Sequence, residues 1–404
     1  MSSPATGTKQ YAYLPGGDAS TRRFPNAIRI GDTIHLSSEP IGATVAAAPP
    51  DIQQQTHRAF ADFVALLEAV GARMADLVKL HTFYVYDGAN DRATAYWEKM
   101  TEVRLQYFAN PGPAGTALRA KGAPTSQRLI AIDGVACPDP ARQRIMPTHA
   151  WDWSMPTPLS QGWRVGPVVY AGGQISADRR GRTVAADDLR QQVVNTMEFL
   201  RHVLVDAGAG FDDIVSLKIG YQDRGDPKAA RAVLDEILRT VQPLIKRERC
   251  TLTCLGIDLL YEGLQLEIDA NAVIADGSKR TVVGVDRGWC GAPGFAAATR
   301  VGDRVHIGAI GAPEGRSIAD QLHTSLQRLD ATLRDVGARA EDLVKLNVLF
   351  TSDEHGESGD CATLHRLLST SLPTPGPVIS LVRVAGLPQP GQRVQVDGVA
   401  ITQA

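Results

Sequence analysis

The chain has 404 residues, more than one compact core usually contains, so two or three domains are expected. Apolar residues make up 44% of the sequence and charged residues 21%, which is typical of a globular protein and excludes disorder or a collagen-like fibre. With 42 Lys and Arg against 44 Asp and Glu, the net charge of -2 gives no field that would attract nucleic acid or an anionic membrane.

Membrane and export signals are also missing from the sequence. No apolar run approaches the ~20 residues of a transmembrane helix, and the first residues lack the apolar stretch of a signal peptide. The five cysteines are too scattered for a disulfide framework or a zinc site, so we expect reduced thiols, no metal and no cofactor. The sequence therefore predicts a cytoplasmic protein whose partner is a small molecule.

Three stretches of the chain repeat one another. One marker string occurs at residues 76–87, 213–223 and 342–353. A second occurs at residues 132–136, 268–272 and 396–400. Both markers recur at nearly the same spacing, and a fixed period is the signature of a repeated fold. We predict three domains, over residues 10–140, 155–276 and 290–404.

In chain order, each repeat opens with a strand hairpin. In the second repeat, apolar residues at three- and four-residue steps then predict a helix over residues 189–208. Residues 213–223 are predicted to form a strand, and residues 227–241 a second helix that Asp226 caps and Pro227 begins. Two closing strands complete the order β-β-α-β-α-β-β. This order predicts an α+β domain with two helices on one face of a mostly antiparallel sheet.

Two proline-rich segments that contain tryptophan, residues 137–158 and 275–294, separate the repeats and are predicted to be linkers or lids. Near the end of the second repeat, strand alternation puts Arg249, Thr251 and Thr253 on one face. The intervening residues, among them Cys250 and Cys254, are expected to face the core.

The second repeat resembles the Rid (YjgF) family of enamine/imine deaminases. The resemblance rests on Gly-Gly-Gln-Ile at residues 172–175, on the string at 213–223, and on Arg-Cys-Thr-Leu-Thr-Cys at 249–254 followed by Glu-Ile-Asp-Ala at 267–270. It implies a chorismate-mutase-like fold and a trimeric arrangement with ligand clefts between subunits. Three fused copies then imply a pseudo-trimer in one chain. Chorismatases, built from similar fused domains, are a more distant resemblance.

The same resemblance implies the residues of the site. Arg249 would bind the carboxylate of the substrate, Glu267 would position water, and Thr251 would stand beside them. Gly172 and Gly173 would lie against the substrate, although both also suit a turn or a strand. At the Arg position the other repeats would have Gly115 and Ile379, or a neighbour within one residue of Ile379, and at the Glu position Ala131 and Gln395. Only the second repeat would therefore keep the charged pair.

An aromatic residue from a neighbouring repeat would complete that cleft. The corresponding positions hold Phe24 in the first repeat and Phe295 in the third, but Leu159 in the second. We therefore expect one site, made by Arg249 and Glu267 with one of the two phenylalanines.

Three interpretations of this site remain open. Its chemistry would be imine hydrolysis with release of ammonia and a 2-oxo acid, or else chorismatase-like cleavage of a cyclic enol ether. Alternatively Arg249 and Glu267 merely pair with each other in a noncatalytic binding protein. The recurrence of Asp133, Asp269 and Asp397 favours a structural turn or a bond across the interface over chemistry. We expect a monomer with internal pseudo-threefold symmetry.

Overall fold

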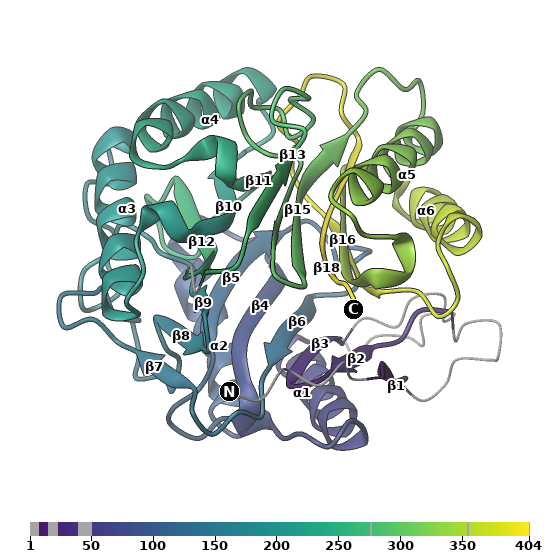
Figure 1. Ribbon diagram of the computed structural model, residues 1–404. Helices are drawn as coiled ribbons and strands as arrows, with labels where there is room; N and C mark the ends of the chain where they lie inside the picture. The colour runs from purple at the N-terminus through teal and green to yellow at the C-terminus, as the bar shows by residue number, and fades with distance from the viewer. Residues whose placement is uncertain (1–7, 15–22, 39–50, 275–276, 354, 404) are drawn as a thin grey trace.

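The computed structural model describes residues 8–14, 23–38, 51–274, 277–353 and 355–403. In these residues the chain forms three six-stranded sheets, each with two long helices (Figure 1). The sheets face the middle of the molecule, and the helices lie on its outside. None of the helices in these ranges is both long and apolar enough to cross a membrane. The predicted α+β class with three tandem domains is confirmed.

The first sheet, in repeat 1, has the strand order β1-β2-β3-β6-β4-β5. Its strands are β1 (Gln10–Ala12), β2 (Ala27–Ile30), β3 (Thr33–Ser37), β4 (Leu77–Val85), β5 (Ala114–Ala120) and β6 (Ile130–Ala136). Its helices are α1 (Ile52–Ala69) and α2 (Ala93–Arg104). The strands β4 and β5 pair in parallel, because α2 crosses over between them, and the other pairs are antiparallel.

The second and third sheets repeat this order. Repeat 2 contains β7 (Gln143–Ile145), β8 (Gly162–Val165), β9 (Val168–Ala171), α3 (Leu189–Asp206), β10 (Ile214–Gln222), α4 (Pro227–Val241), β11 (Thr251–Ile257) and β12 (Leu266–Val273). Repeat 3 contains β13 (Arg280–Val283), β14 (Ala298–Val301), β15 (Arg304–Gly311), α5 (Ile318–Asp335), β16 (Leu343–Phe350), α6 (Glu357–Ser371), β17 (Val378–Arg383) and β18 (Val394–Ile401).

Local sequence accounts for the helix starts. The Asp226 side chain accepts hydrogen bonds from the backbone N–H groups of Lys228 and Ala229, and Pro227 is the first residue of α4. The predicted bounds of this helix are confirmed. The two segments that we expected to be linkers do more than connect the repeats, because each contributes an edge strand, β7 and β13, to the sheet that follows it.

The strand register identifies equivalent positions in the three repeats. Lys79, Ser216 and Lys345 are equivalent, since each faces the first residue of the parallel strand beside it. In the same register Glu267, Ala131 and Gln395 are equivalent, as predicted. Gly115 and Ile379, however, match Leu252 rather than Arg249. That prediction was wrong by three residues, because sequence alone did not fix where the edge strands begin.

The three sheets close into a ring inside one chain. The edge strand of each repeat meets the start of the next: Ala114 bridges to Ser160, and Thr251 bridges to Ala296. The ring closes where the backbone N–H of Gly376 in repeat 3 donates to the carbonyl of Arg23 in repeat 1, at 2.7 Å. The repeats therefore fit an internal pseudo-trimer with three interfaces.

Candidate functional site

Glu267 lies at the interface between repeats 1 and 2. It is on β12 of repeat 2, is 5% exposed, and its Oε1 accepts a hydrogen bond from the backbone N–H of Ala117 on β5, at 3.3 Å. Burial raises the pKa of Glu267 to about 8, although the Ala117 N–H favours the charged form. At neutral pH this carboxyl group is therefore mostly protonated and able to donate a proton.

Two glycines make room for Glu267. Gly173, just after β9, lines the same cavity, and a Cβ atom there would lie 1.8 Å from Oε1 of Glu267. The backbone N–H of Gly173 donates to the carbonyl of Gly115 at 2.9 Å, and a Cβ on Gly172 would lie 2.9 Å from that same carbonyl oxygen. Both residues thus allow the two repeats to approach closely around the carboxyl group.

Arg249 is not beside Glu267. It ends a short 3-10 helix (Arg247–Arg249) before β11 and its side chain is exposed. Along β10, Thr251 pairs with Ser216 whereas Glu267 pairs with Gly220, so Arg249 and Glu267 lie toward opposite ends of that strand. At about 3.3 Å per residue this separates them by roughly 20 Å. The structure does not form the expected Arg249–Glu267 cleft, nor an ion pair between them.

Arg249 instead belongs to the interface between repeats 2 and 3, where its carbonyl accepts a hydrogen bond from Oγ1 of Thr299 at 3.0 Å. Thr251 is buried, and its hydroxyl donates to the carbonyl of Val215 at 3.1 Å. Thr251 lines a central pocket together with Thr253, and not the cavity of Glu267. The alternation predicted for these threonines and for the buried Cys250 and Cys254 is confirmed.

Neither phenylalanine contacts the Glu267 cavity. Phe295 packs in a core cluster with Cys250 and Cys290, at the interface between repeats 2 and 3. Phe24 packs in the core of repeat 3, where a Cβ on Gly376 would lie 2.6 Å from its ring. The residue that reaches the Glu267 cavity from the aromatic position is Leu159.

An arginine that the sequence analysis did not single out occupies this cavity. Arg104, the last residue of α2, is 2% exposed and lines the cavity with Glu267. Its Nη2 donates to Oγ1 of Thr82 at 3.3 Å, and the guanidinium lies 5.9 Å from the ring centre of Trp97. Its Nε has no hydrogen-bond partner among the described residues, and no carboxylate there forms an ion pair with it.

Burial lowers the pKa of Arg104 to about 10, so the side chain still carries its charge at neutral pH. Tryptophans form much of the remaining wall: Trp97 from α2, and Trp151 and Trp153 from the segment between β7 and β8. The ring N–H of Trp151 donates to the side chain of Gln174 at 3.2 Å. The space open to the centre of a water molecule is about 20 Å³, which is room for about one water.

A comparison of repeats contains the signal that identifies Arg104. At the offset of 137 residues that relates the first two repeats, Trp97 corresponds to Leu234 and Arg104 to Val241. Both residues of repeat 2 are fully buried on the apolar face of α4. A charged residue at a core position of one repeat only is therefore a visible departure from the pattern.

The equivalent carboxyl position is neutral at the other two interfaces. In repeat 3 Gln395 donates from Nε2 to the carbonyl of Cys254 at 2.8 Å and accepts from Gln392 at 3.2 Å, so its amide is satisfied. In repeat 1 the position is Ala131. Only the interface between repeats 1 and 2 combines a buried carboxyl group with a buried arginine at these positions.

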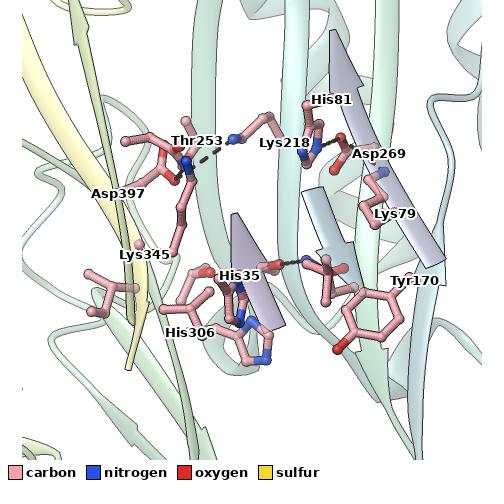
Figure 2. Close-up of a pocket in the computed structure, with 18 of the residues that line it drawn as sticks. His35, Lys79, His81, Tyr170, Lys218, Thr253, Asp269, His306, Lys345 and Asp397 are labelled. Atoms are coloured by element: carbon pink, nitrogen blue, oxygen red, sulfur yellow. Dashed lines mark hydrogen bonds and ion pairs between the residues drawn. The ribbon is translucent and has the colours of Figure 1, made fainter. Parts of the chain in front are cut away.

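A second cavity lies where the three sheets meet, and Figure 2 shows its polar lining. The three equivalent aspartates bond across it from one repeat to another. Asp269 accepts from Nε2 of His81 at 2.9 Å, Asp133 pairs with Lys345 at 3.2 Å, and Asp397 pairs with Lys218 at 3.8 Å. Of the two structural roles expected for these aspartates, a turn or a bond across the interface, the structure shows the bond.

Comparison with known proteins agrees with the fold. The Endoribonuclease L-PSP family matches residues 18–137 and 154–274. A RutC family protein of Pyrococcus abyssi is 34% identical over 115 residues, which cover 28% of this chain and 84% of that relative. A 2-iminobutanoate/2-iminopropanoate deaminase of Dermatophagoides farinae is 28% identical over 109 residues, covering 26% of this chain and 79% of that protein.

Among solved structures, a chorismatase matches with a TM-score of 0.49 and 15% identity, covering 61% of this chain and 77% of the chorismatase. The Escherichia coli protein TdcF, solved with bound serine, matches with a TM-score of 0.28 and 24% identity, covering 32% of this chain and 98% of TdcF.

Proposed function

Because the chain belongs to the Endoribonuclease L-PSP (Rid/YjgF) family, we propose that its interface between repeats 1 and 2 is a hydrolase site for a small enamine or imine that carries a carboxylate. The products are ammonia and a 2-oxo acid. The observation that carries this proposal is the buried Arg104, which has no carboxylate partner among the described residues and shares a cavity with the buried Glu267.

Arg104 supplies the binding chemistry. A guanidinium presents a planar set of N–H donors that holds a carboxylate through two parallel hydrogen bonds. In this cavity it makes one hydrogen bond to Thr82 and leaves Nε without a partner among the described residues. A substrate carboxylate would neutralise the buried charge and complete its hydrogen bonds.

Glu267 supplies the proton transfer. The Glu267 carboxyl group first gives its proton to the imine nitrogen. Water then adds to the carbon of the protonated C=N bond while the Glu267 carboxylate takes one of the water protons, and it passes that proton to the amino nitrogen. The C–N bond then breaks, ammonia leaves, and the remaining hydroxyl proton returns to the Glu267 carboxylate as the C=O bond forms. One water is consumed, and one ammonia and one 2-oxo acid are produced. The raised pKa suits this role, since the group must donate and accept a proton near neutral pH.

The walls of the cavity constrain how a substrate enters. Trp151 and Trp153 come from the segment that we expected to be a linker or lid, and they pack over the site with Trp97. Because the cavity has room for about one water, we expect this segment to move outward when a substrate binds. The deaminase of Dermatophagoides farinae, matched in sequence, supports the choice of imine chemistry.

The test is release of ammonia and 2-oxo acid from a 2-aminoacrylate-type substrate. We expect Glu267→Gln to lower the rate by about 10²–10⁴-fold, the usual contribution of a general acid or base. The matched control is Glu262→Gln, which changes an exposed carboxylate in the loop before β12 and should leave the rate unchanged. Equal rates for wild type and Glu267→Gln would overturn the proposal.

The same residues also suit a second reaction. A protonated carboxyl group beside an arginine and aromatic walls fits cleavage of a cyclic enol ether that carries a carboxylate, as in the chorismatase alternative. Incubation with chorismate and detection of pyruvate separates the two chemistries. Saturable binding of both substrates without any product would instead indicate a noncatalytic binding protein.

A further inference from the structure

The central cavity differs from the proposed active site in position and chemistry. It measures about 90 Å³ of space open to the centre of a water molecule, which is room for several waters. Its lining comes from all three sheets and includes equal numbers of lysines and aspartates: Lys79, Lys218, Lys345, Asp133, Asp269 and Asp397.

Without counting histidines, the lining of this cavity has one basic side chain more than it has acidic ones. His81 places Nδ1 2.9 Å from a carboxylate oxygen of Asp133 and Nε2 2.9 Å from one of Asp269. Burial would raise the pKa of both aspartates, but the surrounding cations, with Lys345 and Lys79 the strongest, hold it well below its usual range. Arg304 also lines the cavity and adds one guanidinium to the three ammonium groups. Four positive groups then face three negative ones.

The lysine of repeat 2 is the one that breaks the pattern. In repeats 1 and 3 the lysines stand at equivalent positions, and each donates to the hydroxyl of the neighbouring edge strand: Lys79 to Thr116 at 2.9 Å, and Lys345 to Ser380. Repeat 2 has Ser216 at that position and places Lys218 two residues later on the same face.

As a result, the repeat 2 ammonium is not held by a hydroxyl. Lys218 Nζ is 3.8 Å from Asp397, beyond hydrogen-bond distance, and Thr253 makes no hydrogen bond among the described residues. Figure 2 shows Lys218 extending from its strand toward Asp397, with Thr253 close by. The shift of one lysine thus presents an ammonium and a hydroxyl to the cavity.

Two further side chains face the cavity with unused hydrogen-bonding atoms. His35 and His306 are each 5% exposed, and the Nε2 atom of each has no partner among the described residues. Figure 2 shows them next to each other. Burial lowers the pKa of both rings to about 3, so they are neutral and each has one N–H to donate.

We propose that this central cavity binds one small oxyanion, held by Lys218 and Thr253 with His35 and His306 nearby. The excess positive charge requires a counter-charge, because burying unbalanced charge is costly. An oxyanion supplies the charge and the acceptors that the ammonium, hydroxyl and imidazole N–H groups need. Asp397 Oδ2, which also lacks a partner among the described residues, favours an anion that carries a proton, such as hydrogen phosphate.

Isothermal titration of the full chain tests this, with inorganic phosphate as the first probe and acetate as the second. We expect saturation at one site per chain below about 10 mM, and at least a tenfold weaker affinity in Lys218→Met. Thr253→Val keeps the shape of the side chain and removes the hydroxyl, so it should weaken binding with an unchanged melting temperature. Arg249→Met, in an exposed side chain, is the control and should bind as wild type does.

Three results decide the proposal. Saturation by phosphate, by acetate or by both, lost in Lys218→Met and weakened in Thr253→Val, supports it, and the preferred probe shows whether the oxyanion is tetrahedral or planar. No saturation by either probe overturns it. Binding that is equal in wild type and Thr253→Val also overturns it, even if Lys218→Met fails to fold.

Discussion

A single charged side chain distinguishes the interface between repeats 1 and 2. Arg104 stands where repeat 2 has Val241, so a charged guanidinium replaces an aliphatic group in the core beneath the helix. A buried cation without a carboxylate partner lowers the stability of the fold, and destabilising groups of this kind are concentrated at ligand-binding and catalytic sites. Arg104 therefore lowers the stability of the folded protein and provides a group that can bind a ligand.

The first prediction separates these two effects. Replacing Arg104 with Met removes the buried charge and keeps the length of an apolar chain, so we expect the free energy of unfolding to rise by about 1–4 kcal/mol. Urea denaturation at pH 7 measures it. A fall of similar size would show that Arg104 is held by structural contacts beyond its bond to Thr82.

The second prediction concerns the pH dependence caused by Glu267. Its folded pKa of about 8 lies above the ordinary value of 4.5, so between these values the folded chain keeps a proton that the unfolded chain loses. Stability from this group is thus present below pH 4.5 and lost as pH rises to 8, by up to about 5 kcal/mol.

The Glu267→Gln variant lacks this dependence. We expect it to match wild type at pH 5 and to exceed it by a few kcal/mol at pH 9, in urea denaturation at both values. A constant difference across this range would mean that Glu267 is already ionised in the folded protein. In the activity assay, the wild-type rate should decline as pH rises through 8.

At the scale of the elements, the end of β9 and the strand β5 determine the position of the carboxyl group. Gly173 follows β9, and its N–H bonds to Gly115 of β5 across the interface. Glu267 then bonds to Ala117 of the same strand. These two hydrogen bonds, at 2.9 and 3.3 Å, use backbone groups of β5 and place the Glu267 carboxyl group against repeat 1.

The third prediction follows from this close approach. In Gly173→Ala the added Cβ would overlap Oε1 of Glu267, so the carboxyl group must turn away from Ala117. We expect kcat to fall by about 10²-fold, with a loss of stability of about 1–3 kcal/mol. Gly210→Ala is the control, since nothing lies within 4 Å of its Cβ position and its activity should equal that of wild type.

A wild-type rate in Gly173→Ala would show that the orientation of Glu267 does not matter for catalysis. A deficit in Gly210→Ala of the same size would instead point to a general effect of glycine substitution.

The elements themselves were largely predictable from the sequence. Helix α4 was predicted with its bounds, because Asp226 and Pro227 are local signals of a helix start. The equivalence of Glu267 and Gln395 also followed from the repeat pattern. The edge strands β7 and β13 were not predicted, since their pairing depends on the sheet that receives them rather than on their own residues.

The composition of the site was predicted only in part. Glu267 was expected, and it lies in a cavity with Gly173. Arg249 was expected beside it, but β11 begins at Thr251, so Arg249 precedes the strand and faces a different repeat. Arg104 could not be predicted from its own repeat, because long-range contacts decide which helix covers which cleft.

At the scale of the whole molecule, fusion of the repeats lets the interfaces differ. Asp269 accepts hydrogen bonds from His81 and Thr116 and pairs with Lys79, all in repeat 1. Its equivalent Asp397 accepts one hydrogen bond, from Asn347 at 2.7 Å, and its ion pair with Lys218 is longer, at 3.8 Å. The interface that contains the proposed site is therefore the one with the denser set of charged contacts around this position.

The fourth prediction compares these two aspartates. Asp269→Asn leaves Lys79 and His81 without their shared carboxylate, so we expect a loss of about 3–5 kcal/mol in the free energy of unfolding. Asp397→Asn should lower the free energy of unfolding clearly less.

The mass from light scattering should stay near 43.3 kDa in the wild type, since the ring closes within one chain, whereas a mass near three chains would contradict that closure.

The position of the active site is the central claim, and paired arginine variants test it most directly. The measurement is kcat/KM for ammonia release from a 2-aminoacrylate-type substrate by Arg104→Met and by Arg249→Met. We predict a loss of about 10²-fold in Arg104→Met, which removes the carboxylate-binding group, and a wild-type value in Arg249→Met, whose side chain is exposed at another interface. A wild-type value in Arg104→Met together with a large loss in Arg249→Met would contradict the account and place the reaction between repeats 2 and 3.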